Sequence, residues 1–189
     1  NIIVLLNLLS GCKLPLNLDF IYGDILDTNL MRLLVPQVDT VIHLASIVGE
    51  PACVIDPLFA QDVNIQGTRT LLANMSHGQR LIFTSTSSVY GNRPNEIVTE
   101  TSQPIPINNY AQHKYQAEQD IQHSGIEYII IRPVTAFGIT YRTRIDLLVN
   151  TLIYHALSFS KVEIYEPNIM RPIIHIDDFV DVIMAAIYD

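Results

Sequence analysis

Tyr110 and Lys114 are the two residues of this sequence whose types and spacing could do proton-transfer chemistry. They stand four apart in "NNYAQHKYQAEQDIQHSG" (108–125), a stretch of helical period, so one face of the predicted helix carries both the phenol and the ammonium. A cation that close favours the phenolate and lowers the pKa of the tyrosine toward the range of an acid–base catalyst. Exposed helices also carry such pairs without any chemical role, so the rest of the chain must decide.

A run of hydroxyl side chains, Thr84 to Ser88, follows the apolar segment "RLIF" (80–83) and precedes a Tyr-Gly pair. Serine and threonine gather in solvated loops because they hydrogen-bond their own backbone, and a loop alone would explain the run. If 80–85 is a strand of a parallel sheet, however, the run lies at the carboxyl end of that sheet, where α/β proteins bind their ligands. One of these hydroxyls could then face a substrate.

The elements that must position these residues alternate along the chain. Apolar or β-branched runs predict strands at 2–6, 19–22, 40–45, 80–85 and 127–133, and helical periodicity predicts helices at 27–34, 56–75 and 108–125. Strands that alternate with helices indicate parallel βαβ units, and therefore an α/β fold with a doubly wound, Rossmann-type sheet. After Gly138 the pattern changes to a helix, two short strands ("KVEIY" and "PIIHI") and a closing helix.

Composition excludes several classes of function. The 189 residues carry a net charge of −8 with eleven scattered Lys and Arg, which argues against a nucleic-acid partner. The longest strongly apolar stretch, 2–9, is too short to span a bilayer, so no membrane partner is expected. Cys12 and Cys53 fit no metal-ligand spacing, and the six histidines form none either. We expect no metal, and a reducing, cytoplasmic location.

Seven segments, taken together and in order, resemble the extended short-chain dehydrogenase/reductase family, in its nucleotide-sugar epimerase/dehydratase branch. They are "GDILD" (23–27), "DTVIHLAS" (39–46), "NIQGT" (64–68), "FTSTSSVYG" (83–91), "YAQHK" (110–114), "IRPVTAFG" (131–138) and "RPIIHIDD" (171–178). Each segment is common by itself, but their shared order and spacing extend over nearly the whole chain. The resemblance implies a Rossmann-type fold and an enzyme that acts on nucleotide sugars.

The catalytic residues implied by the resemblance are Thr86, Tyr110 and Lys114. Tyr110 takes the position of the acid–base residue, and Lys114 tunes it and binds the nicotinamide ribose. Thr86 takes the position of the family's Ser or Thr that hydrogen-bonds the reacting sugar oxygen. Among the five hydroxyls of the run, Thr86 is therefore the one expected to face the substrate.

The resemblance also implies a cofactor and a substrate. The cofactor is NAD, with NADP as the alternative, and its contacts beyond Tyr110 and Lys114 fall on Asn7, Asp24, Ile25, Leu44, Ala45, Ser46, Pro133 and Val134. The nucleotide sugar is expected to contact Thr86, Thr135 and Arg171. A turn aspartate at position 24 and a surface ion pair at position 171 are simpler readings that stay open. Asn64, Gly67, Thr68 and the apolar-flanked His43 are expected to be structural.

The chain departs from the family at its beginning. Family members open with a strand and a glycine-rich turn that holds the cofactor pyrophosphate, whereas the glycines here are too far apart for that motif. The opening "NIIVLLNLLSG" instead resembles the family's second strand, with Leu6 at the position of the usual ribose-binding acid and Asn7 as a weaker candidate. We therefore expect an NAD(P)-binding domain at 1–138 that lacks its first strand, and a partial substrate-binding region at 139–189.

The expected function is a nucleotide-sugar 4-epimerase that oxidises C4 transiently with bound NAD. In 4,6-dehydratases of the family an Asp-Glu pair follows the catalytic threonine, whereas Ser87 and Ser88 stand here, which disfavours dehydration. An NADP-dependent reductase and a decarboxylating or dehydrating relative are the alternatives within the family. A non-catalytic binding or scaffold protein is the alternative outside it. The resemblance also allows a homodimer.

Overall fold

The computed structural model describes residues 19–93, 96–140, 143–164 and 170–188. These residues fall into two compact units, one ending at Arg132 and the other beginning at Pro133. The sequence-based division after Gly138 lies further along the chain. The difference arises because strand β4 (Thr135–Phe137) pairs with strand β5 (Ile173–His175) and so belongs with the later residues.

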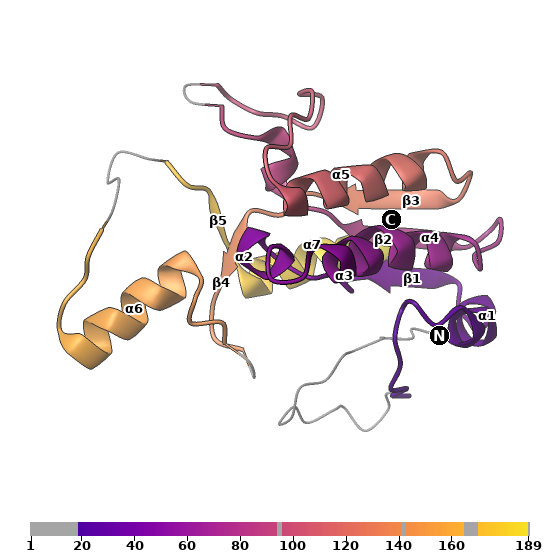
Figure 1. The fold of residues 1–189 in the computed structure, drawn as a ribbon, viewed down its shortest axis with the longest axis horizontal. Helices are drawn as coiled ribbons and strands as arrows, with labels where there is room; N and C mark the ends of the chain where they lie inside the picture. The colour runs from indigo at the N-terminus through magenta and orange to yellow at the C-terminus, as the bar shows by residue number, and fades with distance from the viewer. Residues whose placement is uncertain (1–18, 94–95, 141–142, 165–169, 189) are drawn as a thin grey trace. The chain divides into compact units, whose positions relative to one another are not determined.

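The first unit contains a parallel three-stranded sheet in the order β1 (Thr40–His43), β2 (Arg80–Thr84) and β3 (Glu127–Ile131) (Figure 1). The central strand is buried over Leu81, Ile82 and Phe83, in agreement with the continuous apolar run that predicted it. In register, Phe83 lies beside His43 on one side and Ile130 on the other. The predicted parallel α/β architecture is confirmed.

The helices of the first unit begin and end at residues that the sequence marks. They are α1 (Thr28–Leu34), α2 (Glu50–Cys53), α3 (Pro57–Gln61), α4 (Gly67–Leu72) and α5 (Asn109–Gln122), with 3₁₀ turns at Val35–Gln37 and Ser87–Tyr90. The side chains of Asp27, Asp56 and Asn108 cap α1, α3 and α5. A π-helical turn (Asp62–Gln66) joins α3 to α4, where the sequence predicted one uninterrupted helix.

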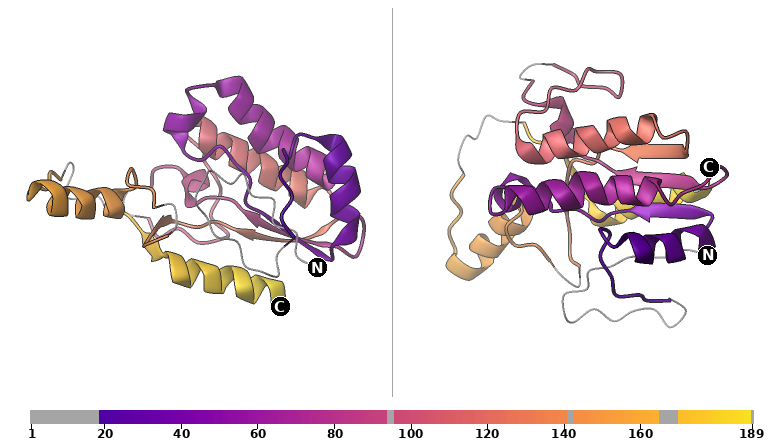
Figure 2. Two further views of the ribbon diagram at one scale, coloured as in Figure 1. Left: turned by 90° about the horizontal axis from the view of Figure 1, so that it is seen from below. Right: turned by 45° about the vertical axis from the view of Figure 1, so that its right-hand side comes forward.

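Helix α5 is held against the central strand by an apolar core. Ala117 and Ile121 of α5 pack in one cluster with Leu81 and Phe83 of β2, and Met31 of α1 belongs to the same cluster. Helices α4 and α5 contact each other and lie on one face of the sheet (Figure 2). One face of α5 carries Tyr110, Lys114 and Glu118, which are spaced four residues apart. This packing places that face of the helix beside the end of β2.

Two predicted strands are not found. Residues 19–22 form no strand, because they pair with no other segment among the described residues. The predicted strand 161–165 is also absent over its described part, 161–164. The predicted strand 2–6, together with Leu6 and Asn7, lies outside the described residues.

The second unit consists of the β4–β5 pair and the helices α6 (Leu148–Phe159) and α7 (Ile176–Tyr188). Phe137 and His175 lie opposite each other in the strand pair, and their rings meet edge to face at 5.2 Å. A side chain at Gly138 would collide with Ile176, which explains the glycine there. Across the described residues of both units, no helix has the length and apolar character needed to cross a membrane.

Candidate active site

The hydroxyl run leaves the carboxyl end of β2 and turns at once. Thr84 Oγ1 donates to the His43 carbonyl at 2.9 Å, which ties the end of β2 to that of β1. Thr86 is 8% exposed and caps the 3₁₀ turn Ser87–Tyr90, because its hydroxyl accepts from the Ser88 amide at 3.2 Å. Ser85 lies between them with a buried Oγ that has no partner among the described residues. The run is thus an ordered turn in which the buried Ser85 hydroxyl has no hydrogen-bond partner among the described residues.

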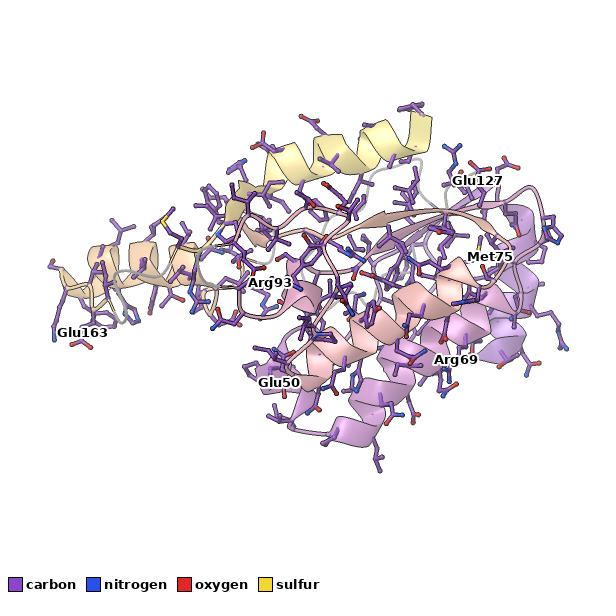
Figure 3. The ribbon with its side chains drawn as sticks, turned by 90° about the horizontal axis from the view of Figure 1, so that it is seen from above. Glu50, Arg69, Met75, Arg93, Glu127 and Glu163 are labelled. Carbon is purple, nitrogen blue, oxygen red and sulfur yellow. The ribbon has the colours of Figure 1, made fainter. Side chains whose placement is uncertain are left out.

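Tyr110 lies in the first turn of α5, half-buried, and its backbone is fixed by an acidic side chain from another element. The Glu50 carboxylate accepts from the Tyr110 amide at 3.0 Å and from the Asn109 side chain at 3.1 Å. Figure 3 labels Glu50, which lies near the start of α5. An acidic group at a helix N-terminus satisfies free amides and complements the helix dipole. Glu50 therefore joins the segment after β1 to the start of α5, a contact that no neighbouring residue in the sequence indicates.

Lys114 is 2% exposed, and its Nζ lies 4.0 Å from the centroid of the Phe83 ring on β2. Burial lowers the pKa of this ammonium from 10.5 to about 7, and the nearby Glu118 carboxylate opposes that shift. An amine with such a pKa can exchange its proton near neutral pH. Through its contact with Phe83, Lys114 lies against β2, the strand that Thr86 follows.

The segment after β1 is held by Asn64, which lies in the π-helical turn and is 2% exposed. Asn64 Oδ1 accepts from Ser46 Oγ and from the Ile47 amide, both at 2.8 Å, while its Nδ2 donates to the Ile47 carbonyl at 3.1 Å. π-Helical turns often occur at functional sites. Here the π-helical turn directs the Asn64 amide into the loop after β1, where it holds Ser46 and Ile47.

The expected structural residues of this region do pack as structural residues. His43 is buried, contacts Thr68 Oγ1 at 2.9 Å and packs on Phe83 at 5.2 Å. Burial, and secondarily the Lys114 charge, lowers the pKa of His43 to about 3, so it is neutral at physiological pH. A Cβ on Gly67 would lie 2.7 Å from Ile25, which is why a glycine stands there.

The other predicted binding residues are divided between the two units. Asp24 forms a turn in which its Oδ1 accepts from the Leu26 amide at 2.9 Å, and the Ile25 side chain is buried in the core. Ala45 packs against that core. Four residues belong to the second unit, where Pro133 and Val134 are half-buried while Thr135 and Arg171 are exposed. Among the described residues, no three His, Cys, Asp or Glu side chains come together as a metal set.

Comparison with known proteins gives a consistent set of matches. Residues 2–189 match the model of the NAD dependent epimerase/dehydratase family. A UDP-glucose 4-epimerase of Halalkalibacterium halodurans is 36% identical over 149 residues, which cover 72% of this chain and 44% of that protein. This chain thus spans less than half the length of that relative.

Solved structures agree with the sequence matches. The UDP-glucuronic acid 4-epimerase of Bacillus cereus, in complex with UDP-glucuronic acid and NAD, superposes with a TM-score of 0.80 at 30% identity, covering 93% of this chain and 57% of that one. The UDP-glucose 4-epimerase of Thermotoga maritima, with UDP-glucose, gives a TM-score of 0.83 at 26% identity, covering 98% and 63%. The Rossmann-type fold is therefore confirmed by experimental structures.

Proposed function

Because the chain belongs to the NAD dependent epimerase/dehydratase family, we propose that it acts on a nucleotide sugar at C4 as an NAD-dependent 4-epimerase. The observation that supports this function most is the meeting of α5 with the end of β2, where Lys114 lies on Phe83 and the turn capped by Thr86 contacts α5. Similar proteins bind UDP-sugars and NAD, which supports the same substrate and cofactor classes here.

The described residues fit a dinucleotide at this end of the sheet. Ser85 has a buried hydroxyl without a partner among the described residues, and Lys114 has a buried ammonium, so both can bind a ligand rich in hydroxyl groups. Asn64 holds Ser46 in the segment after β1, and Leu44 and Ala45 of that segment stay proposed contacts. When bound, NAD would supply reversible oxidation at C4. Asp24, Ile25, Pro133 and Val134 stay proposed contacts.

In the proposed reaction, the residues of this chain move one proton and hold one oxygen. Tyr110 takes the proton of the C4 hydroxyl as C4 is oxidised, and returns it when C4 is reduced from the other face. Lys114 favours the phenolate by its positive charge and binds the nicotinamide ribose. Thr86 orients the C4 oxygen, while Thr135 and Arg171 are proposed to hold the sugar and its diphosphate.

Epimerisation is favoured over dehydration by the residues next to Thr86. The family's dehydratases, which this chain also resembles, carry an Asp-Glu pair at the two positions where Ser87 and Ser88 stand here. Neither serine can replace a carboxylate as the acid or base of an elimination. An epimerase regenerates its cofactor in each turnover, because the hydrogen removed from C4 returns to the same sugar. Added reductant is therefore unnecessary.

The test incubates the full chain with UDP-glucose and, separately, UDP-glucuronic acid, without added reductant. We expect a C4 epimer to form, and Tyr110→Phe to abolish its formation while the fold stays intact. Tyr115→Phe is the matched control, because Tyr115 lies on the same helix outside the proposed site. Consumption of reduced cofactor would indicate a reductase instead. Absence of both product and dinucleotide binding would indicate a non-catalytic protein.

A further inference from the structure

Arg132, the residue that follows β3, forms a buried ion pair with Glu118 of α5. Its Nε and Nη2 donate to the two carboxylate oxygens of Glu118 at 3.0 and 2.6 Å. The Glu118 side chain is fully buried and that of Arg132 is 17% exposed, so both charges have lost most of their hydration. Buried ion pairs often add no net stability over apolar residues of similar volume. Stability alone therefore does not account for this pair.

The same guanidinium makes a further contact, to Tyr90. Arg132 Nη1 donates to the Tyr90 hydroxyl at 2.7 Å, and the guanidinium carbon lies 4.9 Å from the centre of the Tyr90 ring. Nη1 also approaches the Glu100 carbonyl at 3.5 Å. One planar side chain with donors in fixed directions thus connects the end of β3, the middle of α5 and the turn after β2.

Tyr90 is the last residue of the turn that Thr86 caps. The turn is short and internally bonded, with the Val89 amide donating to the Thr86 carbonyl at 3.3 Å and the Gly91 amide to the Ser88 carbonyl at 3.1 Å. Gly91 has φ +72°, and a Cβ there would lie 2.3 Å from a backbone oxygen, so the exit of the turn is also restricted. Thr86 and Tyr90 are therefore the two ends of one short, internally bonded turn.

Glu118 lies on the face of α5 that carries the proposed catalytic residues. It follows Lys114 by four positions and Tyr110 by eight, so the three side chains occupy successive turns of one helix face. We infer that Arg132 is a positioning residue, which sets Thr86 relative to Tyr110 and Lys114 by holding Tyr90 with one part of its guanidinium and Glu118 with the other. The effect on catalysis rests on the proposed function, whereas the restraint of the turn by Arg132 does not.

Such positioning matters because proximity effects are steep. A displacement of about 1 Å by a change far from the reacting atoms can reduce a rate by about 10²-fold. Loss of the Arg132–Tyr90 bond should displace Thr86, which orients the reacting C4 oxygen, and leave the other proposed sugar contacts, Thr135 and Arg171, unchanged. It should therefore reduce kcat more than it changes KM. A residue with a merely structural role would lower stability and leave the kcat of the folded protein unchanged.

The experiment compares Tyr90→Phe and Arg132→Lys with the wild-type full chain. Tyr90→Phe keeps the ring and removes only the hydroxyl, so it remains informative if Arg132→Lys fails to fold. Asp120→Asn is the matched control, because it breaks an ion pair of the same helix, 2.7 Å from Arg69 of α4, without touching the turn. Two quantities are measured: kcat and KM with the nucleotide sugar, and amide hydrogen exchange of residues 86–91 without ligand.

We expect both test variants to lower kcat at least about tenfold with KM within about threefold, in line with the steepness of positioning effects. Exchange of residues 86–91 should rise in both while α5 stays protected, and Asp120→Asn should change neither quantity. Unchanged exchange in Tyr90→Phe, or faster exchange with unchanged kcat, would overturn the inference. If wild type has no activity, the proposed function fails, and exchange still decides whether Arg132 holds the turn.

Discussion

Replacing Lys114 by methionine should stabilise the fold while it removes the proposed activity. Burial lowers the pKa of Lys114 from 10.5 to about 7. At pH 7 the unfolded chain then carries this lysine fully protonated, whereas the folded chain carries it half protonated. At about 1.4 kcal/mol per pKa unit, this difference destabilises the folded state by about 4 kcal/mol. Methionine has a similar length and no charge, so the substitution removes that penalty.

Part of the gain is lost again. The ammonium lies 4.0 Å from the Phe83 ring, and a desolvated cation–π contact of this kind is worth about 2 kcal/mol. We therefore expect a net gain of about 2 kcal/mol in the free energy of unfolding at pH 7. Because the folded-state pKa is depressed, the penalty fades as pH rises from 7 toward 10.5. The gain should shrink by about 3 kcal/mol between pH 7 and pH 10.

The assay is urea unfolding of the full chain at both pH values, for wild type and Lys114→Met. Lys161→Met is the control, because Lys161 is an exposed lysine paired with Glu163, and its replacement should change stability little at either pH. Because all other titratable groups are the same in both proteins, their contributions cancel in the difference between the two free energies of unfolding. A Lys114→Met protein that is less stable than wild type at pH 7, or a gain independent of pH, would refute the reasoning.

Three further predictions concern the residues that surround the site. His43 has a pKa lowered to about 3, so acid should destabilise wild type by about 2 kcal/mol between pH 7 and pH 5; His43→Gln should lack this loss in pH-dependent urea unfolding, and an equal loss in both proteins would contradict the assignment. Asn64→Ala should release the loop at Ser46 and Ile47 and weaken NAD binding about tenfold by titration, since a buried hydrogen-bonded group is worth about 1–3 kcal/mol. Glu50→Gln should lower stability by about 0.3–1 kcal/mol through the lost charge at the start of α5, and unfolding curves that coincide with wild type would exclude that role.

Local signals in the sequence were sufficient for the pieces that carry the proposed chemistry. The helical spacing of Tyr110 and Lys114 predicted their shared helix, and the structure caps that helix at Asn108. The apolar run before Thr86 predicted the central strand, so the hydroxyl run was correctly placed at a strand end. These predictions depend on capping and periodicity, which neighbouring residues determine.

Contacts between distant segments were not predictable in the same way. Glu50 caps a helix that begins almost sixty residues later, and nothing beside Glu50 in the sequence indicates that partner. The Glu118–Arg132 pair likewise depends on the packing of α5 against β3. The segment 19–22 has the composition of a strand yet forms none, because a strand needs a partner that composition does not provide.

The central claim, transient oxidation at C4 with Tyr110 as the proton-transfer residue, is tested most directly with a nucleotide sugar that carries deuterium at C4. The full chain is incubated with it in ordinary water without added reductant, and the products are analysed by mass spectrometry and NMR. We predict a C4 epimer that retains the deuterium, formed by wild type and by Tyr115→Phe and absent with Tyr110→Phe. An epimer that has lost its deuterium to water, or equal turnover by Tyr110→Phe, would contradict the account.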